Sequence, residues 1–303
     1  MTTPASTDPT EVTAPLSERV AGAPISWGVC EVPGWGYQLS PDRVLGEMRG
    51  LGLTSTEFGP DGFLPAEPTA KAKRLESLGM RAVGGFLPVL LHDAAQDPLP
   101  QVDAFIDACV AAGADVVVLA ASTGVDGYDN RPVLDENGWQ TMLSNLDRIA
   151  GHADERGVNA SLHPHVGTMV ERIEEVDRVL ADSRIGLCLD TGHLRVGGSD
   201  PVALAQRQPR RINHVHLKDV DDSKAEKVFA GQLAYGDAVR AGMFRPLGQG
   251  DIDIAGLVAA LERAGYQGWY VLEQDVRLDA EPTGLGPVAN VRQSLEYLLE
   301  VSL

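Results

Sequence analysis

Five of the seven histidines lie close together in the chain, between His163 and His216. Imidazole nitrogens bind divalent metals and exchange protons near neutral pH, so such a group of histidines suits either chemistry. Two carboxylates accompany them, because Asp190 lies within this stretch and Glu273 follows it. Histidine and carboxylate together supply the mixed nitrogen and oxygen ligands that Mn²⁺, Co²⁺ or Zn²⁺ accept. These residue types therefore predict a divalent metal site.

The spacing of these residues is that of a repeated structural unit. His163 and Asp190 are 27 residues apart, and Asp190 and His216 are 26 residues apart. Glu273 follows His216 by 57 residues, about two units, and an insertion accounts for the extra length. Residues one unit apart reach equivalent heights on neighbouring strands when each unit is a strand and a helix. We therefore predict that these four residues hold one cation, Mn²⁺ or Co²⁺ first, with Zn²⁺ or Mg²⁺ as further options.

Short apolar runs alternate with longer amphipathic stretches from residue 19 onward. The apolar runs predict strands at Val20–Trp27, Leu53–Phe58, Arg81–Leu87, Asp115–Ala120, Val158–His163, Ile185–Asp190, Ile212–Leu217 and Gly268–Glu273. The longer stretches predict helices at Pro41–Leu51, Thr69–Leu78, Leu99–Ala112, Gly138–Arg156, Val170–Ala181, Ile254–Ala264 and Val288–Val301, and a short one from Pro201. Parallel neighbouring strands need crossover connections, which these helices supply. Eight such units favour an α/β fold of one closed (β/α)8 TIM barrel, and no Gly-rich dinucleotide string follows the first strand.

Other chemically capable side chains fall at the same strand ends, which meet at the active site of such a barrel. His165 follows strand five, and His193 follows strand six closely enough to lie over the metal. Glu57 ends strand two and is expected to face substrate. Trp27 ends strand one and is expected either to line a sugar pocket or to pack in the core. The catalytic candidates are His163, His193, Glu273, Glu57 and Lys218, and the substrate-binding candidates are Trp27, His165 and Glu57.

The string HVHLKD places three basic side chains on or just after strand seven. His214 and His216 alternate with Val215, so both point to the same side, and His216, nearer the C-terminal end, is the better metal ligand. Lys218 comes shortly after His216 and is expected to point to the opposite side. There it would pair with Asp219 or another carboxylate behind the barrel, although a catalytic role stays open.

Charge and composition narrow the class of protein. The chain carries 25 basic and 43 acidic residues, a net charge of −18, which repels nucleic acid and anionic membrane surfaces. The longest apolar runs are too short to span a bilayer. Three cysteines, an odd number without a CxxC string, fit a reducing cytoplasm better than a disulfide scaffold. We therefore expect a cytoplasmic protein that acts on a small molecule.

Two regions depart from the repeat. Residues 1–18 are rich in Thr, Pro and Ala, contain no Lys or Arg, and lack the features of a secretory signal, so we expect a disordered tail. Residues 19–303 are expected to form the barrel. A polar, partly helical stretch at about 219–250 predicts an insertion after strand seven, which would serve as a lid or as a contact in a homo-oligomer.

Six strings of the sequence carry a resemblance. They are CLDTGHL (Cys188–Leu194), HVHLKDV (His214–Val220), PLGQGDIDI (Pro246–Ile254), GYQGWYVLEQD (Gly265–Asp275), LHPHVGT (Leu162–Thr168) and TEFGPDGFLP (Thr56–Pro65). Together they resemble the xylose-isomerase-like TIM barrels, a group that includes sugar isomerases, ketose 3-epimerases, endonuclease IV and myo-inosose dehydratase. The resemblance covers nearly the whole chain after the tail, and the histidine-rich string after strand five looks most like myo-inosose dehydratase.

The resemblance implies a metal held by the ends of strands five to eight, which matches Asp190, His216 and Glu273 directly. The epimerases of this group carry a glutamate where this chain has His163, and they use two glutamates on opposite faces of the substrate. Only Glu273 remains here, which disfavours that reaction. The resemblance therefore implies a metal-dependent lyase that dehydrates a keto-inositol through an enolate. A ketose or keto-sugar isomerase or epimerase is the first alternative, and a sugar-binding barrel without activity is the second.

Overall fold

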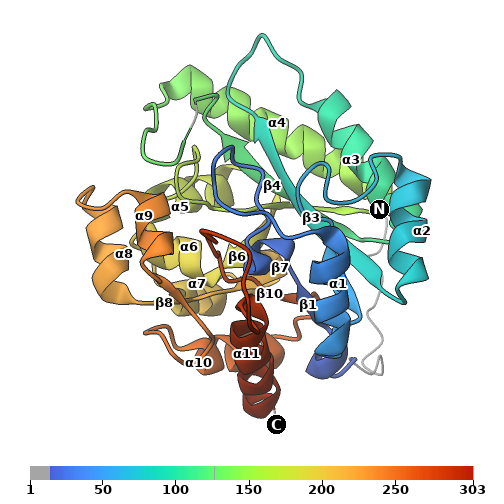
Figure 1. Ribbon diagram of the computed structural model, residues 1–303. Helices are drawn as coiled ribbons and strands as arrows, with labels where there is room; N and C mark the ends of the chain where they lie inside the picture. The colour runs from blue at the N-terminus through green and yellow to red at the C-terminus, as the bar shows by residue number, and fades with distance from the viewer. Residues whose placement is uncertain (1–13, 126, 303) are drawn as a thin grey trace.

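The computed structural model describes residues 14–125 and 127–302. Eight parallel strands close into a barrel in the order β1-β10-β7-β6-β5-β4-β3-β2. Helices lie around the outside of these strands, as Figure 1 shows. Since each strand is followed by at least one helix before the next barrel strand begins, the predicted (β/α)8 TIM barrel is confirmed.

The barrel strands are short and lie where the apolar runs predicted them. They are β1 (Val20–Gly22), β2 (Ser55–Glu57), β3 (Arg81–Leu90), β4 (Val116–Ser122), β5 (Asn159–Leu162), β6 (Gly186–Asp190), β7 (Ile212–Leu217) and β10 (Tyr270–Leu272). Strand β4 begins with three consecutive valines, all buried, because the barrel interior covers one face and the helices cover the other.

The helices begin and end at residues with a clear physical role. They are α1 (Pro41–Gly50), α2 (Pro68–Ser77), α3 (Leu99–Ala112), α4 (Glu136–Glu155), α5 (Ile173–Asp182), α6 (Thr191–Val196), α7 (Pro201–Arg207), α8 (Asp222–Phe229), α9 (Tyr235–Arg240), α10 (Ile254–Arg263) and α11 (Pro287–Val301). The Ser40 side chain accepts from the Arg43 backbone N–H and caps α1, with Pro41 in the first turn. Gly113 ends α3 in a left-handed conformation with φ 67°, which glycine adopts without steric cost.

The register of the strands puts the candidate ligands at one level of the barrel. Asp190 on β6 pairs with His216 on β7, and His216 in turn pairs with Val271 on β10. Glu273 directly follows β10, and His163 directly follows β5. The side chains that end these four strands therefore meet at the C-terminal end of the barrel, where barrel enzymes carry their active sites.

Two local elements differ from the sequence prediction. The first strand was expected at Val20–Trp27, but β1 ends at Gly22 and Pro24–Trp27 form a 3-10 helix. Pro24 has no backbone N–H to donate, so it cannot continue the ladder. Helix α6 was not predicted, and it starts at the end of β6 because the Asp190 side chain accepts from the His193 backbone N–H.

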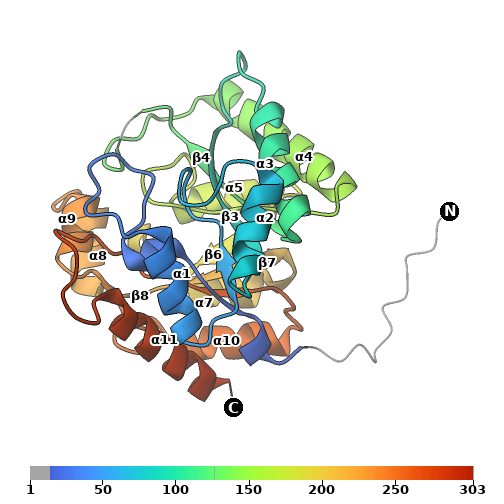
Figure 2. The same cartoon turned by 45° about the vertical axis from the view of Figure 1, so that its right-hand side comes forward.

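The stretch 219–250 folds against the barrel between β7 and α10. It contains β8 (Asp219–Val220), which pairs antiparallel with β9 (Phe244–Arg245), and the helices α8 and α9 between them. Both helices, orange in Figures 1 and 2, lie beside each other at one side of the molecule.

The expected N-terminal tail lies only partly within the described residues. Residues 1–13 are outside them, whereas Leu16–Glu18 form a short 3-10 helix in which Leu16 is buried. Across the residues that the structure describes, no helix combines the length and the apolar character needed to cross a membrane.

Candidate metal centre

The four predicted ligands come together at the C-terminal end of the barrel. Nδ1 of His216 lies 2.5 Å from Oε2 of Glu273 and 3.5 Å from Oδ2 of Asp190. Nε2 of His163 lies 3.2 Å from the same Asp190 oxygen. The side chains of His163, Asp190 and His216 are buried, and that of Glu273 is 11% exposed. The structure therefore gathers Asp190, His216 and Glu273 close enough to hold one ion, and His163 adjoins this group through Asp190.

Two of these atoms are buried without a hydrogen-bond partner. They are Nδ1 of His216 and Oε2 of Glu273, and their close approach lacks the geometry of a hydrogen bond. Buried polar atoms in proteins are nearly always satisfied. Burial alone would lower the pKa of His216, but Cys188, Glu273 and Glu57 raise it well above its usual range, so without a metal Nδ1 carries a proton that a cation would displace. The donor set of imidazole and carboxylate suits Mn²⁺, Co²⁺ or Zn²⁺.

The charges around the centre also favour a cation. Burial alone would raise the pKa of Glu273, but His216 and Lys218 together lower it to about 2. Burial would likewise raise the pKa of Asp190, yet Lys218 and the neighbouring histidines hold it well below its usual range. Both carboxyl groups are therefore ionised, and a single lysine faces them together with a third carboxyl group, that of Asp275.

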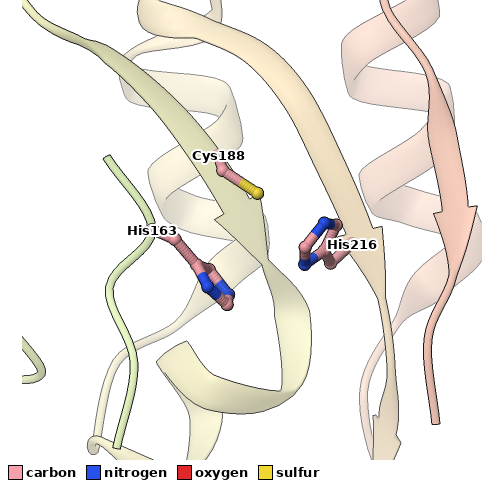
Figure 3. A group of neighbouring side chains, drawn as sticks. All are labelled: His163, Cys188 and His216. Carbon is pink, nitrogen blue, oxygen red and sulfur yellow. The ribbon is translucent and has the colours of Figure 1, made fainter. Parts of the chain in front are cut away.

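His163 and His216 face each other across the centre. Figure 3 shows their imidazoles and the Cys188 thiol pointing toward one another, and the two ring centroids are 4.9 Å apart. Burial raises the pKa of the Cys188 thiol to about 11, so it is protonated at neutral pH. Cys188 lies close enough to both imidazoles for the three side chains to form a further group that could hold a metal ion.

Glu57 reaches across the barrel interior from β2 and fixes the orientation of two histidines. Its Oε1 lies 2.9 Å from Nε2 of His214 and 2.9 Å from Nε2 of His216. A carboxylate accepts hydrogen bonds, so both Nε2 atoms carry a proton, and Nδ1 of His216 is the nitrogen that faces Glu273 and Asp190. A carboxylate that holds a ligating histidine by its other nitrogen is a common device of metal sites.

Replacement of Glu57 by glutamine is expected to weaken the binding of Mn²⁺ or Zn²⁺ by about 10- to 100-fold, because the amide holds the His216 tautomer less firmly. Competition with a chelator of known affinity measures this change. Glu47→Gln is the matched control, since Glu47 is bonded to Trp27 and Arg43 on the outer side of the barrel. Equal metal affinity in the Glu57 variant and the wild type would show that Glu57 does not position His216.

Lys218 points into the centre and not behind the barrel. Its Nζ lies 2.5 Å from Oδ2 of Asp190, 2.7 Å from Oε1 of Glu273 and 3.4 Å from Oδ1 of Asp275. Burial alone would lower the pKa of Lys218, but these three carboxylates raise it well above its usual range. The ammonium therefore stays charged and holds the carboxylates in place.

The predicted direction of Lys218 was wrong for a simple reason. Leu217 separates it from His216, so the alternation along an extended chain returns Lys218 to the same side as His216. Asp219, its expected partner, instead accepts hydrogen bonds from four backbone N–H groups, those of Val220, Gly248, Gly250 and Ile252. Asp219 therefore shapes the loop that follows β9.

His165 and His193 stack on each other beside the centre, with ring centroids 3.7 Å apart. Nδ1 of His165 lies 2.7 Å from the carbonyl oxygen of Val166, so it carries the proton and Nε2 keeps a lone pair. Nδ1 of His193 accepts from the Val166 backbone N–H, so its proton is on Nε2. Burial lowers the pKa of both imidazoles, to about 3 for His165, which keeps them neutral.

A cavity of about 200 Å³ opens onto the centre. Its walls include the predicted site residues His163, His165, Glu57 and Glu273. His193 and Lys218 are not among its lining residues, because His165 and the carboxylates cover them. A larger cavity of about 570 Å³ lies between α8 and the connection from β4 to α4, and none of the candidate ligands lines it.

Trp27 reaches neither this cavity nor the candidate ligands. Its side chain is fully buried, and its indole N–H donates to Oε2 of Glu47 on α1. The 3-10 helix Pro24–Trp27 turns the ring toward α1 and away from the strand ends. Of the two roles considered for Trp27, the structure gives it core packing.

Three residues of the site were not singled out from the sequence. Asp275 and Tyr128 line the cavity, and the hydroxyl of Tyr235 donates to Asp275. Asp275 stands two residues after Glu273, so strand alternation was a usable signal for it. Tyr235 and Tyr128 lie on the insertion and on a loop, where no periodicity indicates direction.

A comparison with protein-family models agrees with this architecture. The family described as xylose isomerase-like TIM barrel matches residues 49–301. The chain belongs to this family. The resemblance drawn from the sequence strings is thereby confirmed.

Within the xylose isomerase-like TIM barrels, curated relatives match over nearly the full chain. An inosose dehydratase of Geobacillus kaustophilus is 31% identical over 293 residues, covering 92% of this chain and 93% of that protein. The rhizopine catabolism protein MocC of Rhizobium meliloti is 32% identical over 301 residues, covering 95% of this chain and 89% of that protein.

Solved structures share the fold at lower sequence identity. An IOLI protein with a bound zinc atom superimposes with a TM-score of 0.68 at 16% identity, covering 94% of this chain and 98% of that one. An L-ribulose 3-epimerase superimposes with a TM-score of 0.66 at 16% identity, covering 94% of each chain. These matches establish the shared barrel.

Proposed function

We propose that this protein is a metal-dependent lyase that removes water from a keto-inositol through an enolate. One observation carries the proposal: Asp190, His216 and Glu273 form a group that could hold a metal, with His163 next to it, beside a small cavity in a chain that matches inosose dehydratases over nearly its full length. The unpaired cysteines fit a reducing compartment, so we place the reaction in the cytoplasm.

Four residues would hold the cation: His163, Asp190, His216 and Glu273. A divalent cation there would act as a Lewis acid toward the carbonyl and an adjacent hydroxyl of the substrate. Glu57 holds Nδ1 of His216 toward this point, and Lys218 holds the carboxylates of Asp190 and Glu273. Two buried polar residues, Glu57 and Lys218, thus keep the ligands in position.

In this proposal His165 is the base that removes the proton from the substrate. Its Nδ1 donates a hydrogen bond to the Val166 carbonyl, so the lone pair is on Nε2, and the side chain lines the cavity. Burial lowers the pKa of His165 to about 3, so the imidazole is a weak base, and it would take the proton from the carbon next to the ketone, leaving an enolate, only where a bound cation has made that carbon more acidic. The same proton then passes to the hydroxyl on the neighbouring carbon, the C–O bond breaks, and water leaves as the C=C bond forms. His193, stacked on His165, fixes the plane of the ring.

The cavity lining favours a neutral polyol over a charged sugar. Five carboxyl groups line it, and Lys71 is its one side chain with a permanent positive charge; the acidic residues are Glu31, Glu57, Asp61, Glu273 and Asp275. Phosphate or carboxylate substituents would be repelled by this lining. Hydroxyl groups, in contrast, can donate to it, which agrees with a keto-inositol as the substrate.

The end of β5 bears on the choice between elimination and epimerisation. The epimerases of this family are expected to use two glutamates, one on each face of the substrate. This chain has His163 in place of one of them, so only Glu273 remains. A proton removed on one face then has no matched acid on the other face. This difference supports the lyase over the isomerase or epimerase.

Removal of the metal tests the proposal. Dialysis of the protein against a chelator is expected to abolish the formation of a dione-absorbing product from a keto-inositol, and added Mn²⁺ or Co²⁺ is expected to restore it. The physical reason is the loss of the Lewis acid that stabilises the enolate. Turnover of keto-inositols that is unaffected by exhaustive chelation would contradict the metal dependence. A protein that converts none of a set of keto-inositols with Mn²⁺ or Co²⁺ present would contradict the assignment as a lyase.

A further inference from the structure

We propose that Asp275 binds a hydroxyl group of the substrate and that Tyr235, from the insertion, positions it for this. The inference rests on the proposed function, in which the substrate is a keto-inositol or a similar polyol. It assigns a recognition role to two residues that no ligand or proton-transfer step above requires.

Asp275 offers the cavity a free acceptor atom. The residue is 7% exposed, and it lines the cavity beside Glu273 and His163. Its Oδ1 has no hydrogen-bond partner, with the Lys218 ammonium 3.4 Å away. Buried acceptors are nearly always satisfied in proteins, so an unsatisfied one in the wall of a cavity indicates a place for a donor from a ligand.

Tyr235 donates a hydrogen bond to the other oxygen of this carboxylate. Its hydroxyl donates to Oδ2 of Asp275 across 2.5 Å, so Oδ1 is the atom left for a ligand. The ring of Tyr235 is fully buried and packs against the rings of His193 and Trp35, with centroids 5.9 and 6.3 Å apart. Helix α9 therefore delivers a rigid donor to the site, and the insertion forms part of the substrate wall.

The chemistry of the free atom selects the ligand group. A carboxylate oxygen accepts a hydrogen bond from O–H and repels phosphate and carboxylate groups. Asp275 follows Glu273 by two residues and lines the same cavity, so the recognised hydroxyl lies near the reacting carbons. We therefore expect the pair to distinguish a keto-inositol from an analogue that lacks one specific hydroxyl.

Steady-state kinetics with scyllo-inosose tests the role of Asp275. Asp275→Asn is expected to raise KM about tenfold or more and to change kcat less, because the lost contact is to a hydroxyl that does not react and is present throughout the reaction. Bound Mn²⁺, measured on the same samples, is expected to stay at the wild-type level, which separates this effect from damage to the metal centre. Unchanged KM in a folded Asp275→Asn variant would overturn the proposal.

Monodeoxy keto-inositols identify the contact directly. One analogue of the series is expected to bind the wild type at least tenfold more weakly than scyllo-inosose, and Asp275→Asn is expected to lose most of this discrimination. Equal discrimination by both proteins would overturn the proposal. Where the Asp275 variant does not fold, Tyr235→Phe takes its place in this comparison, because its hydroxyl donates to the same carboxylate, and undiminished discrimination by Tyr235→Phe would then overturn the proposal.

Tyr235→Phe tests the positioning role. It is expected to raise KM by a smaller factor, roughly threefold to tenfold, and to add little when combined with Asp275→Asn, because both variants act on one contact. Tyr266→Phe is the matched control: that buried hydroxyl donates to the Trp269 carbonyl, away from the cavity, and its loss should leave KM unchanged. Fully additive effects of the two substitutions would overturn the link between Tyr235 and Asp275.

The failure of this inference is distinguishable from failure of the proposed function. A wild-type protein that dehydrates scyllo-inosose but shows no sensitivity to Asp275→Asn overturns the inference alone. A wild-type protein that neither binds nor converts scyllo-inosose overturns the proposed function and the inference together.

Discussion

Replacement of Glu273 by glutamine is expected to lower turnover by about 1000-fold or more and to remove tightly bound metal. The amide keeps the size of the side chain, and its oxygen can still accept from Lys218, so the fold is expected to persist. What is lost is a negatively charged ligand oxygen, Oε2, that stands unpaired 2.5 Å from Nδ1 of His216. A Lewis acid contributes several kcal/mol to such a reaction, which corresponds to this loss of rate.

Metal analysis by mass spectrometry, together with initial rates, measures both effects. Glu262→Gln is the matched control, because Glu262 pairs with Arg19 and Tyr270 away from the cavity. The control variant should retain metal and rate. Full metal content and full rate in the Glu273 variant would show that Glu273 is not a ligand of the metal.

Replacement of Lys218 by methionine is expected to lower the free energy of unfolding by about 3–5 kcal/mol, because it leaves buried carboxylates without their partner. For a chain of this size the melting temperature should fall by roughly 5–15 °C. The carboxylates concerned are those of Asp190, Glu273 and Asp275, each within 3.4 Å of the ammonium. A cation that binds beside them compensates part of this charge, so added Mn²⁺ should raise the melting temperature more in the variant than in the wild type.

Thermal melts with and without Mn²⁺ check this expectation. Lys224→Met is the matched control, since Lys224 pairs with Asp221 at the surface and such a pair contributes at most about 1 kcal/mol. A Lys218 variant that melts like the control would show that the ammonium does not hold the carboxylates together.

The barrel and the ligands were predictable because they follow regular periods. Apolar runs, glycine stops and the repeat of about 26 residues give the strands, and the last residue of each strand lies at one height. The prediction that His163, Asp190, His216 and Glu273 lie near one another needed nothing more than this repeat, and their proposed role as metal ligands follows from the chemistry of the side chains.

The supporting residues were harder to predict because their roles depend on contacts across the barrel. Glu57 was expected to face substrate and does line the cavity, but its contacts across the barrel interior with His214 and His216 could not be read from any local pattern. Tyr235 enters the site from the insertion, whose packing on the barrel depends on tertiary contacts. Trp27 left the strand ends because Pro24 interrupts β1.

The most direct test of the lyase is product analysis by NMR in D₂O, with the Mn²⁺- or Co²⁺-loaded protein and a keto-inositol. The account predicts a product that has lost one water, carries a new C=C bond next to the carbonyl or its dione tautomer, and forms only when the metal is present. Efficient epimerisation of a ketose, with no dehydrated product from any keto-inositol, would contradict the lyase and put an isomerase or epimerase in its place.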